Sequence, residues 1–268
     1  MRIIIHEDYD KLSNWVAHYI AAKINHAKQT TEKPFILGLP TGSSPIGTYQ
    51  ALVRLYKEKK VSFKNVITFN MDEYVGLPEN HPESYHYFMH HYLFDHIDIP
   101  RENINILNGN AKDLDAECAD YEAKIKTVGG FDLFLGGIGV NGHLAFNEPG
   151  SSITSRTRVK TLAYETIIAN SRFFDNNISR VPKTALTVGV GTVMEAREIL
   201  IIINSYRKAR ALQKVVEESV NHMWTVSMLQ LHPHGTIVCD DEATLDLKVS
   251  TVKYFKEMEH EAINNLPM

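Results

Sequence analysis

FDLFLGGIGVNGHLAFNEPG, residues 131–150, joins an apolar run to a glycine-rich turn and a group of polar side chains. The run at residues 131–135 is typical of a buried strand. Three glycines follow, which permit tight turning and close approach of a ligand: Gly136, Gly137 and Gly139. Three polar side chains then lie within eight positions: Asn141, His143 and Glu148. A histidine with a nearby carboxylate is the smallest acid/base unit. A glycine-rich turn with a solvated histidine has the same pattern, and spacing alone does not separate the two.

The composition is that of an ordinary globular chain of 268 residues, with 44% hydrophobic and 22% charged residues. The formal net charge of -4 supplies no basic surface for nucleic acid. Cys118 and Cys239 are too few for a disulfide framework and suit a reducing compartment. The N-terminal apolar run is too short for a signal peptide, and no run approaches membrane-spanning length. We therefore expect a cytoplasmic protein with no nucleic-acid or membrane partner.

Strand-like and helix-like segments alternate along the chain. Strands are predicted at residues 3–5, 34–39, 66–69, 131–135, 186–190, 199–203 and 236–239. Helices are predicted at residues 9–27, 45–59, 85–94, 114–126, 206–218 and 251–264, whereas residues 151–181 are too polar to assign. This alternation predicts a single α/β domain over residues 1–268, with a doubly wound, mostly parallel sheet and helices on both faces. Ligands of such sheets bind beyond the carboxyl ends of the strands.

The loop after the second predicted strand reads LPTGSSP, residues 39–45. Ser44 is a favoured N-cap and Pro45 suits the first position of a helix, so free backbone N–H groups should lie here. Gly42 permits close approach, and Thr41 and Ser43 add hydroxyl donors. The sequence therefore predicts a phosphate-binding loop, although the spacing is not that of a Walker loop. A capped helix start without a ligand is the alternative.

Polar residues of two further segments have weaker signals. Asp72 follows the predicted strand at residues 66–69, where a carboxylate faces the ligand crevice, and the adjacent Glu73 should point elsewhere. A lone Asp after a strand is, however, commonly a turn or cap residue. His86 and His90 are four positions apart on a predicted helix, a spacing that can suit zinc. A packed or solvated helix face is the better interpretation, and no metal site is predicted.

Eight long segments carry a resemblance to a known family. They are LGLPTGSSP (37–45), TFNMDEYVGL (68–77), HPESYHYFM (81–89), GGIGVNGHLAFNEPGSS (136–152), RTRVKTL (156–162), ANSRFF (169–174), PKTALTVGVGT (182–192) and NHMWTVSMLQLHP (221–233). From end to end, they resemble the glucosamine-6-phosphate deaminases. The resemblance implies a Rossmann-like fold, a homo-hexamer built as a dimer of trimers, and no metal or organic cofactor. It also implies conversion of D-glucosamine 6-phosphate and water to D-fructose 6-phosphate and ammonia.

The resemblance also implies roles for individual residues. Asp72 is similar to the family's base, which moves a proton between C2 and C1 of the sugar. His143 is similar to the group that opens the sugar ring, and Glu148 to the carboxylate that supports it. The matched substrate-binding residues are Thr41, Gly42, Ser43, Ser44, Gly137, Arg172 and Lys208. Without the resemblance, Arg172 and Lys208 would be interpreted as solvated surface charges.

A second site is implied for an allosteric ligand, N-acetylglucosamine 6-phosphate. Its matched residues are Ser151, Ser152, Arg158, Lys160, Thr161 and Tyr254. Arg158 and Lys160 are two positions apart, so both project to one face of an extended strand and together can hold a phosphate. A subunit interface is the location that the resemblance implies. An ordinary basic loop is the alternative.

One position departs from the family pattern, which has Asp where this chain has Asn141. Asn is nearly isosteric with Asp but neutral, and its NH2 group is a donor. It fills the same space without stabilising a protonated His143, and an amide that faces the ring nitrogen favours the wrong tautomer. We therefore expect reduced turnover. The sequence does not say whether this residue is natural or engineered.

Two other functions remain open at this point. One is a 6-phosphogluconolactonase-like hydrolase, which also binds a sugar phosphate and uses a histidine, although the NMDEYVGL and NEPGSS segments favour the deaminase. The other is a non-catalytic sugar-phosphate sensor, in which Asn141 marks lost activity. Retention of Asp72, His143 and Glu148 argues against a sensor, because binding alone does not need acid/base groups.

Overall fold

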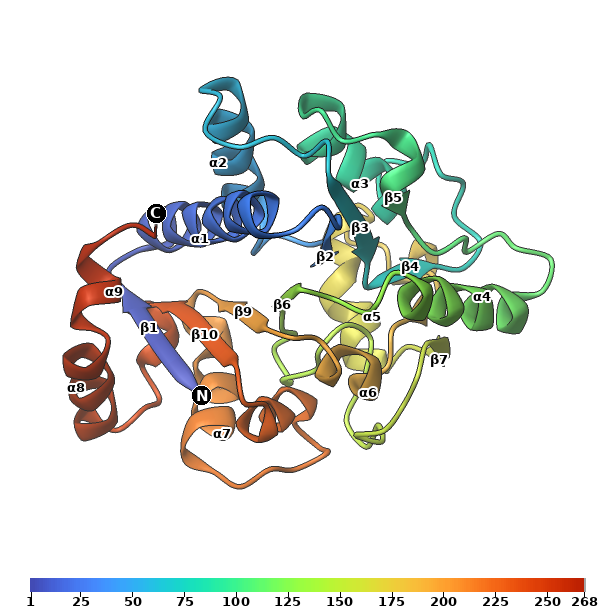
Figure 1. The fold of residues 1–268 in the computed structure, drawn as a ribbon. Helices are drawn as coiled ribbons and strands as arrows, with labels where there is room; N and C mark the ends of the chain where they lie inside the picture. The colour runs from blue at the N-terminus through green and yellow to red at the C-terminus, as the bar shows by residue number, and fades with distance from the viewer. Residues whose placement is uncertain (268) are drawn as a thin grey trace.

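A computed structural model describes residues 1–267 and has a seven-stranded sheet between layers of helices (Figure 1). The strand order is β1-β10-β9-β6-β2-β3-β5, and every pairing is parallel. The strands are β1 Arg2–His6, β2 Phe35–Leu39, β3 Val66–Asn70, β5 Ile104–Asn105, β6 Leu133–Gly137, β9 Ile199–Ile203 and β10 Gly235–Asp240. The predicted Rossmann-like α/β fold with a mostly parallel sheet is confirmed.

Helices cover both faces of this sheet, because the continuous apolar strands bury alternate side chains on opposite sides. In β1, Ile3 and Ile5 belong to one hydrophobic cluster and Ile4 to the other. Helices α1, α2 and α3 pack on the side of Ile4, whereas α4, α7 and α8 pack on the other side (Figure 1). The main helices are α1 Tyr9–Thr30, α2 Ile46–Lys57, α3 Tyr85–Tyr92, α4 Leu114–Thr127, α7 Ala209–Glu217, α8 Val249–Met258 and α9 His260–Asn264.

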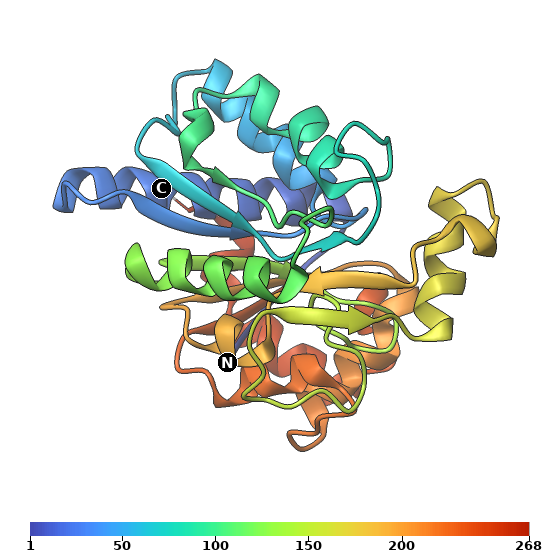
Figure 2. The same ribbon diagram turned by 90° about the vertical axis from the view of Figure 1, so that its right-hand side faces the viewer.

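A second sheet has three antiparallel strands in the order β4-β8-β7. They are β4 Asp72–Tyr74, β8 Thr184–Thr187 and β7 Arg158–Thr161. Residues 70–74 were interpreted from the sequence as a loop after a strand, and this was wrong, because residues 72–74 form β4. Residues 151–181 were left unassigned, although the extended strand assumed for Arg158 and Lys160 is present as β7. The strands are only three or four residues long and pair over long sequence separations, so local periodicity does not indicate them. Figure 2 shows α5 (Tyr164–Asn170) projecting beyond this small sheet.

Several predicted bounds were wrong for identifiable reasons. Gly136 and Gly137 continue β6 and pair with β9, so the strand ends at Gly137 and not at Leu135. A Cβ at Gly136 would lie 2.6 Å from Ile201 Cδ1, so the glycine is a packing requirement at this position. Residues 186–190 were predicted as one strand, but β8 ends at Thr187 and α6 begins at Val190. The predicted helix at residues 251–264 is two helices, α8 and α9.

The carboxyl ends of the parallel strands share one edge of the large sheet, and the small sheet begins directly beyond β3. Segments that are far apart in sequence therefore meet there, after Leu39, Asn70, Gly137 and Ile203. Among the helices of residues 1–267, none combines the length and apolar character needed to cross a membrane.

We predict that Gly38→Ala destabilises the fold. A Cβ at Gly38 would lie 2.4 Å from a ring carbon of the buried Phe134, so strands β2 and β6 would have to separate. Such overpacking should lower the free energy of unfolding by about 1–3 kcal/mol in a urea titration. Gly137→Ala is the matched control, because its Cβ meets nothing nearer than Ser44 Cβ at 3.9 Å. Equal stability of the two variants would contradict this view of the sheet.

Candidate active site

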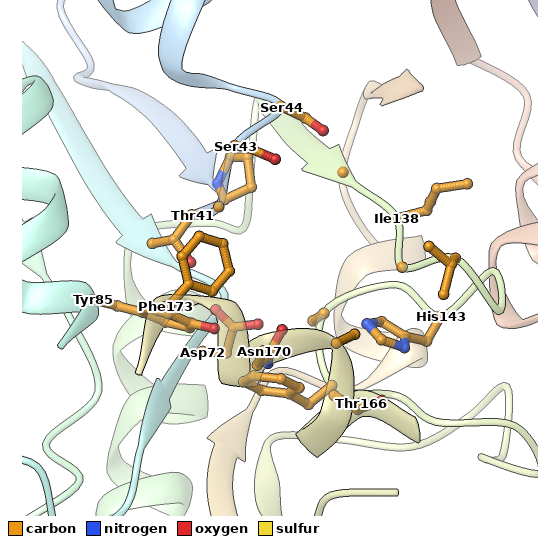
Figure 3. Close-up of a pocket in the computed structure, with 18 of the residues that line it drawn as sticks. Thr41, Ser43, Ser44, Asp72, Tyr85, Ile138, His143, Thr166, Asn170 and Phe173 are labelled. Carbon is orange, nitrogen blue, oxygen red and sulfur yellow. The ribbon is translucent and has the colours of Figure 1, made fainter. Parts of the chain in front are cut away.

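A cavity of about 320 Å³ lies at this edge of the sheet (Figure 3). Ten of the eleven predicted active-site residues line it: Thr41, Gly42, Ser43, Ser44, Asp72, Gly137, Asn141, His143, Arg172 and Lys208. The eleventh, Glu148, is buried beside Asn141 and His143. Figure 3 shows Ser43 and Ser44 on one side of the cavity, with Asp72 and His143 on the other. The structure thus brings together residues from positions 41 to 208.

Ser44 connects the loop after β2 to the segment after β9. Its Oγ donates to Asn204 Oδ1 at 2.7 Å and accepts from Lys208 Nζ at 2.8 Å. The prediction that Ser44 caps the following helix was wrong, because α2 begins at Ile46 and its N-cap position is Pro45, without a side-chain bond. The Ser44 hydroxyl group instead makes hydrogen bonds with Asn204 and Lys208, which belong to a distant segment of the chain.

Two cations converge on this side of the cavity. Lys208 Nζ is held against Ser44, and the Arg172 guanidinium lies 4.6 Å from the centre of the Phe173 ring. Burial, aided by repulsion from Arg172, lowers the pKa of Lys208 to about 8, and the charge of Asp240 opposes this change. Neither cation makes an ion pair with any part of the chain that the structure describes. Two cations beside hydroxyl and backbone N–H groups have the chemistry that a phosphate-binding site needs.

Asp72 supplies a buried carboxylate on the opposite side. It is 5% exposed, and its Oδ1 has no hydrogen-bond partner within residues 1–267. Burial raises the pKa of Asp72 well above its ordinary value, and the negative charge of Glu73 adds to this. The Glu73 carboxylate accepts from the backbone N–H groups of Tyr85 and His86 at 3.0 and 2.9 Å, so its predicted orientation away from Asp72 is confirmed. Asp72 is therefore free to accept a proton or a cation from a ligand.

His143 and Glu148 form the second ionisable group of the cavity. His143 Nδ1 lies 3.4 Å from Glu148 Oε2, at ion-pair distance but without a well-aligned hydrogen bond in the described chain. Burial acts to raise the pKa of Glu148, but the contact with His143 and the Ala163 N–H outweigh burial and lower it to about 2. A Cβ at Gly139 would lie 2.3 Å from His143 Cε1, so this glycine leaves the space that the ring occupies.

Asn141 contacts Glu148 instead of the imidazole ring. Its Nδ2 donates to Glu148 Oε2 at 3.3 Å, and its Oδ1 accepts from the His143 backbone N–H at 3.4 Å. The expectation that the amide faces a ring nitrogen was wrong. Asn141 shares the carboxylate oxygen that lies nearest to the ring, so any effect on the tautomer passes through Glu148.

Several residues that line the cavity were not predicted from the sequence, chiefly Tyr74, Tyr85, Thr166, Asn170, Phe174, Asn204, Ser205 and Arg207. Asn204 could have been found, because it directly follows the apolar strand β9. Asn170 and Phe174 lie in the polar region that was left unassigned. Asn170 Nδ2 donates to Tyr74 Oη at 2.8 Å, which connects α5 to the small sheet over the cavity.

The second predicted site is only partly assembled in one chain. Arg158 lies in β7, and its Nη2 is 3.4 Å from Ser151 Oγ. Lys160 and Thr161 follow in the same strand, and Ser152 is adjacent to Ser151. Tyr254 lies in α8, which Figure 1 shows on the opposite side of the molecule from β7. Within one chain, Tyr254 is therefore separated from the other five predicted residues.

His86 and His90 stack their rings at 5.7 Å in α3. Within residues 1–267, no group of three or more His, Cys, Asp or Glu side chains has the arrangement of a metal site.

Comparison with known proteins identifies relatives over nearly the whole chain. The family model described as glucosamine-6-phosphate isomerases/6-phosphogluconolactonase matches residues 7–239. A glucosamine-6-phosphate deaminase of Phocaeicola vulgatus is 66% identical over 97% of this chain and 98% of its own length. One from Borrelia garinii is 62% identical over 99% of both chains.

Two solved structures have a similar fold. A structure described as a monomeric glucosamine-6-phosphate deaminase is 42% identical and has a TM-score of 0.84, over 91% of this chain and 98% of that chain. A 6-phosphogluconolactonase of Trypanosoma cruzi is 21% identical and has a TM-score of 0.71, over 92% of this chain and 97% of that chain. The second similarity concerns the fold alone.

We predict that sugar-phosphate binding depends on the protonation of Lys208, whose pKa in the free protein is about 8. A sugar phosphate is a dianion above pH 7, so its affinity should be constant up to pH 7.5 and fall by up to about tenfold per pH unit above pH 8. At pH 7, Lys208→Ala should weaken binding by a factor of about ten or more, since a charged hydrogen bond contributes about 1.5–3 kcal/mol. Isothermal titration calorimetry with glucitol 6-phosphate measures both effects.

Lys208→Arg is the control for the pH dependence, because a guanidinium stays protonated across this range. Its affinity should not fall between pH 8 and 9.5. Unchanged affinity in Lys208→Ala would remove Lys208 from the site.

Proposed function

The chain belongs to the family of glucosamine-6-phosphate isomerases and 6-phosphogluconolactonases, and we infer that it is a glucosamine-6-phosphate deaminase. The enzyme converts D-glucosamine 6-phosphate and water to D-fructose 6-phosphate and ammonia, a step of amino-sugar catabolism. The reaction opens the sugar ring, moves a proton from C2 to C1 and releases the amino group. In this proposal residues 1–268 act as one catalytic domain.

The charges of the cavity are the observation that carries this function. Glucosamine 6-phosphate has a phosphate at one end and an ammonium group at C2. Lys208 and Arg172 offer unpaired positive charge beside Ser44, and Asp72 offers a carboxylate oxygen without a partner within the described residues. A substrate that carries both charges would pair with the cations on one side of the cavity and with Asp72 on the other. This complementarity orients the sugar with C1 and C2 near Asp72 and His143.

His143 performs the ring opening. It takes the proton of the C1 hydroxyl group and delivers a proton to the ring oxygen, so that the bond between C1 and the ring oxygen breaks and an aldehyde forms at C1. Glu148, at 3.4 Å from Nδ1, stabilises the protonated imidazole during this exchange. The low pKa of Glu148, about 2, keeps this carboxylate charged throughout.

Asp72 is the base of the isomerisation. It takes the proton from C2, while the ammonium group loses a proton and the aldehyde oxygen at C1 gains one, which gives an enolamine. It then returns its proton to C1, which gives a protonated imine at C2. Water then adds to C2 and ammonia leaves, and fructose 6-phosphate remains. Burial raises the pKa of Asp72 in the free protein, whereas the ammonium group at C2 favours the ionised carboxylate. Substrate binding thus generates the charged base where it is needed.

Lactone hydrolysis is the alternative activity on this fold. The solved 6-phosphogluconolactonases are 15–21% identical to this chain, whereas the curated relatives named deaminases are 62–66% identical. A lactone has no ammonium group to pair with Asp72. The alternative is therefore less well supported.

Ammonia release from glucosamine 6-phosphate, followed with a coupled dehydrogenase, tests the proposed function. We expect release by the unmodified chain and its loss in Asp72→Asn. Glu79→Gln, which changes an exposed carboxylate outside the cavity, is the control for the substitution. Hydrolysis of 6-phosphogluconolactone without ammonia release would favour the lactonase. Binding without turnover of either compound would favour a sensor.

We predict that Asn141→Asp raises kcat on glucosamine 6-phosphate. A carboxylate at position 141 would add negative charge beside Glu148 and His143 and stabilise the protonated ring. General acid–base catalysis contributes about 10²–10⁴, and Glu148 already supplies one carboxylate, so we expect an increase on the order of 10–10³. Because the phosphate side is untouched, KM should change little. Steady-state kinetics of the two proteins measure the difference.

Asn141→Ala controls for removal of the amide and should not raise kcat. Crystals of the unmodified chain soaked in substrate should hold closed-ring or early open-chain sugar, because the defect lies in the first step. An unchanged kcat in Asn141→Asp would mean that Glu148 alone orients the histidine.

We also propose that N-acetylglucosamine 6-phosphate activates the enzyme at Ser151, Ser152, Arg158, Lys160, Thr161 and the Tyr254 of a neighbouring copy. Support comes from Arg158, which makes no ion pair within residues 1–267 although it is partly buried, and lies 3.4 Å from Ser151 Oγ. The homo-hexamer implied by the resemblance would supply the missing Tyr254. Val249 and Met258 of α8 are 71% and 65% exposed in the single chain, which suits such an interface.

We predict that N-acetylglucosamine 6-phosphate binds while glucitol 6-phosphate already occupies the cavity, and that each ligand tightens the other by the same factor. Calorimetric titration of the preloaded protein measures this. Arg158→Ala should abolish the second binding event. Arg156→Ala is the matched control, since Arg156 is already paired with Glu195 and Glu122. Failure of the acetylated sugar to bind the preloaded protein would exclude a separate site.

A further inference from the structure

Ser205 has a backbone conformation that normally belongs to glycine. Its φ and ψ are 76° and 144°, in a region where a Cβ crowds its own backbone. Ser205 directly follows Asn204 at the end of β9 and lines the cavity. Strained residues persist only where the surrounding structure holds them, and they gather at functional sites.

The turn at Ser205 brings the residues on its two sides, Asn204 and Lys208, to one oxygen atom, Ser44 Oγ. Asn204 Oδ1 accepts from Ser44 Oγ at 2.7 Å, and Lys208 Nζ donates to the same Oγ at 2.8 Å. The Lys208 backbone N–H donates to Ser205 O at 3.0 Å, which closes the turn. If Ser205 relaxed to negative φ, the chain would leave β9 in another direction, and Asn204 and Lys208 could not both reach Ser44.

Asp240 holds this turn from the neighbouring strand. It ends β10, which pairs with β9, and it is 5% exposed. The Ser205 N–H lies 3.1 and 3.0 Å from the two carboxylate oxygens of Asp240, and the Ala243 N–H donates to Oδ1 at 2.9 Å. A buried carboxylate that accepts from backbone N–H groups makes strong, charge-assisted bonds. Asp240 is therefore placed to hold Ser205 in a backbone conformation that serine disfavours.

We propose that Asp240 is a positioning residue for the phosphate site and that it acts by holding Ser205 in its strained conformation. This inference rests on the proposed function only for the identity of the ligand as a sugar phosphate. Asp240 accepts hydrogen bonds from the backbone N–H groups of Ser205 and Ala243 and from no side chain of the cavity within residues 1–267, so in this proposal its effect on the ligand passes through the backbone.

A second route exists, because the negative charge of Asp240 also favours the protonated form of Lys208. The two routes predict different responses to glycine at position 205. Glycine adopts the observed φ and ψ without crowding, so it makes the carboxylate dispensable if Asp240 acts by holding the backbone. If Asp240 instead acts electrostatically, glycine at position 205 does not restore the protonated form of Lys208.

The test is a double-mutant cycle of Asp240→Ala and Ser205→Gly, read as KM and kcat on glucosamine 6-phosphate and as affinity for glucitol 6-phosphate. Misplacement of a binding group by about 1 Å can cost on the order of 10²-fold, so Asp240→Ala should raise KM by about tenfold or more. Its kcat should change by less than about threefold, because Asp72 and His143 are untouched. Adding Ser205→Gly should return KM to within about threefold of the unmodified chain.

Asp241→Ala is the matched control: this neighbouring carboxylate pairs with the exposed Lys256 and should leave KM unchanged. Asp240→Leu, which has a similar volume but no acceptor oxygen for the Ser205 N–H, repeats the cycle if Asp240→Ala does not fold. An unchanged KM in the Asp240 variants, or a raised KM that glycine does not rescue, overturns the proposal. Binding of glucitol 6-phosphate decides the cycle even if no ammonia is released, so failure of the proposed function is distinguishable.

Discussion

A buried charge without an ionic partner is the constraint on which the cavity depends. Lys208 is held beside Ser44 with no carboxylate paired to it in the described chain, and burial lowers its pKa to about 8. Asp72 is the counterpart on the other side, and burial raises its pKa. Each charge is costly in the free protein and is compensated when a ligand brings the opposite charge. In the proposed function, the cavity therefore favours a ligand with an anionic and a cationic group at a fixed separation.

The fold supplies these two charges from different parts of the chain. The parallel sheet aligns the ends of β2, β6 and β9, which position Ser44, Gly137 and Asn204. The small sheet starts at Asp72, and its pairing with Thr187 holds this carboxylate at the edge of the cavity. Because the rigid strands end before the polar residues begin, the chemical groups lie on short, well-anchored segments. Two non-glycine residues that line the cavity, Ala145 and Ser205, have a positive φ, and Ser205 has the larger value, 76°.

The sequence predicted six of the seven strands of the large sheet, because each of these six contains an apolar run such as residues 199–203. It did not predict β4 or β5, whose few residues pair with a strand more than thirty positions away. Motifs in the sequence identified the site residues, but they did not predict which of these residues contact one another. Ser44 bonds with Asn204 and Lys208, which lie 160 and 164 positions away, and so it does not cap its own helix. The conformation of Ser205 has no local signal, since a glycine would be expected there.

Pairing of Asp72 with a substrate ammonium group is the most direct test of this account. Affinities of 2-amino-2-deoxyglucitol 6-phosphate and glucitol 6-phosphate, which differ only in the amino group, should be measured on the unmodified chain and on Asp72→Asn. The account predicts that the amino group strengthens binding by about tenfold or more, as a buried charge pair can, and that Asp72→Asn abolishes this advantage. Equal affinity of the two compounds for the unmodified chain would contradict it.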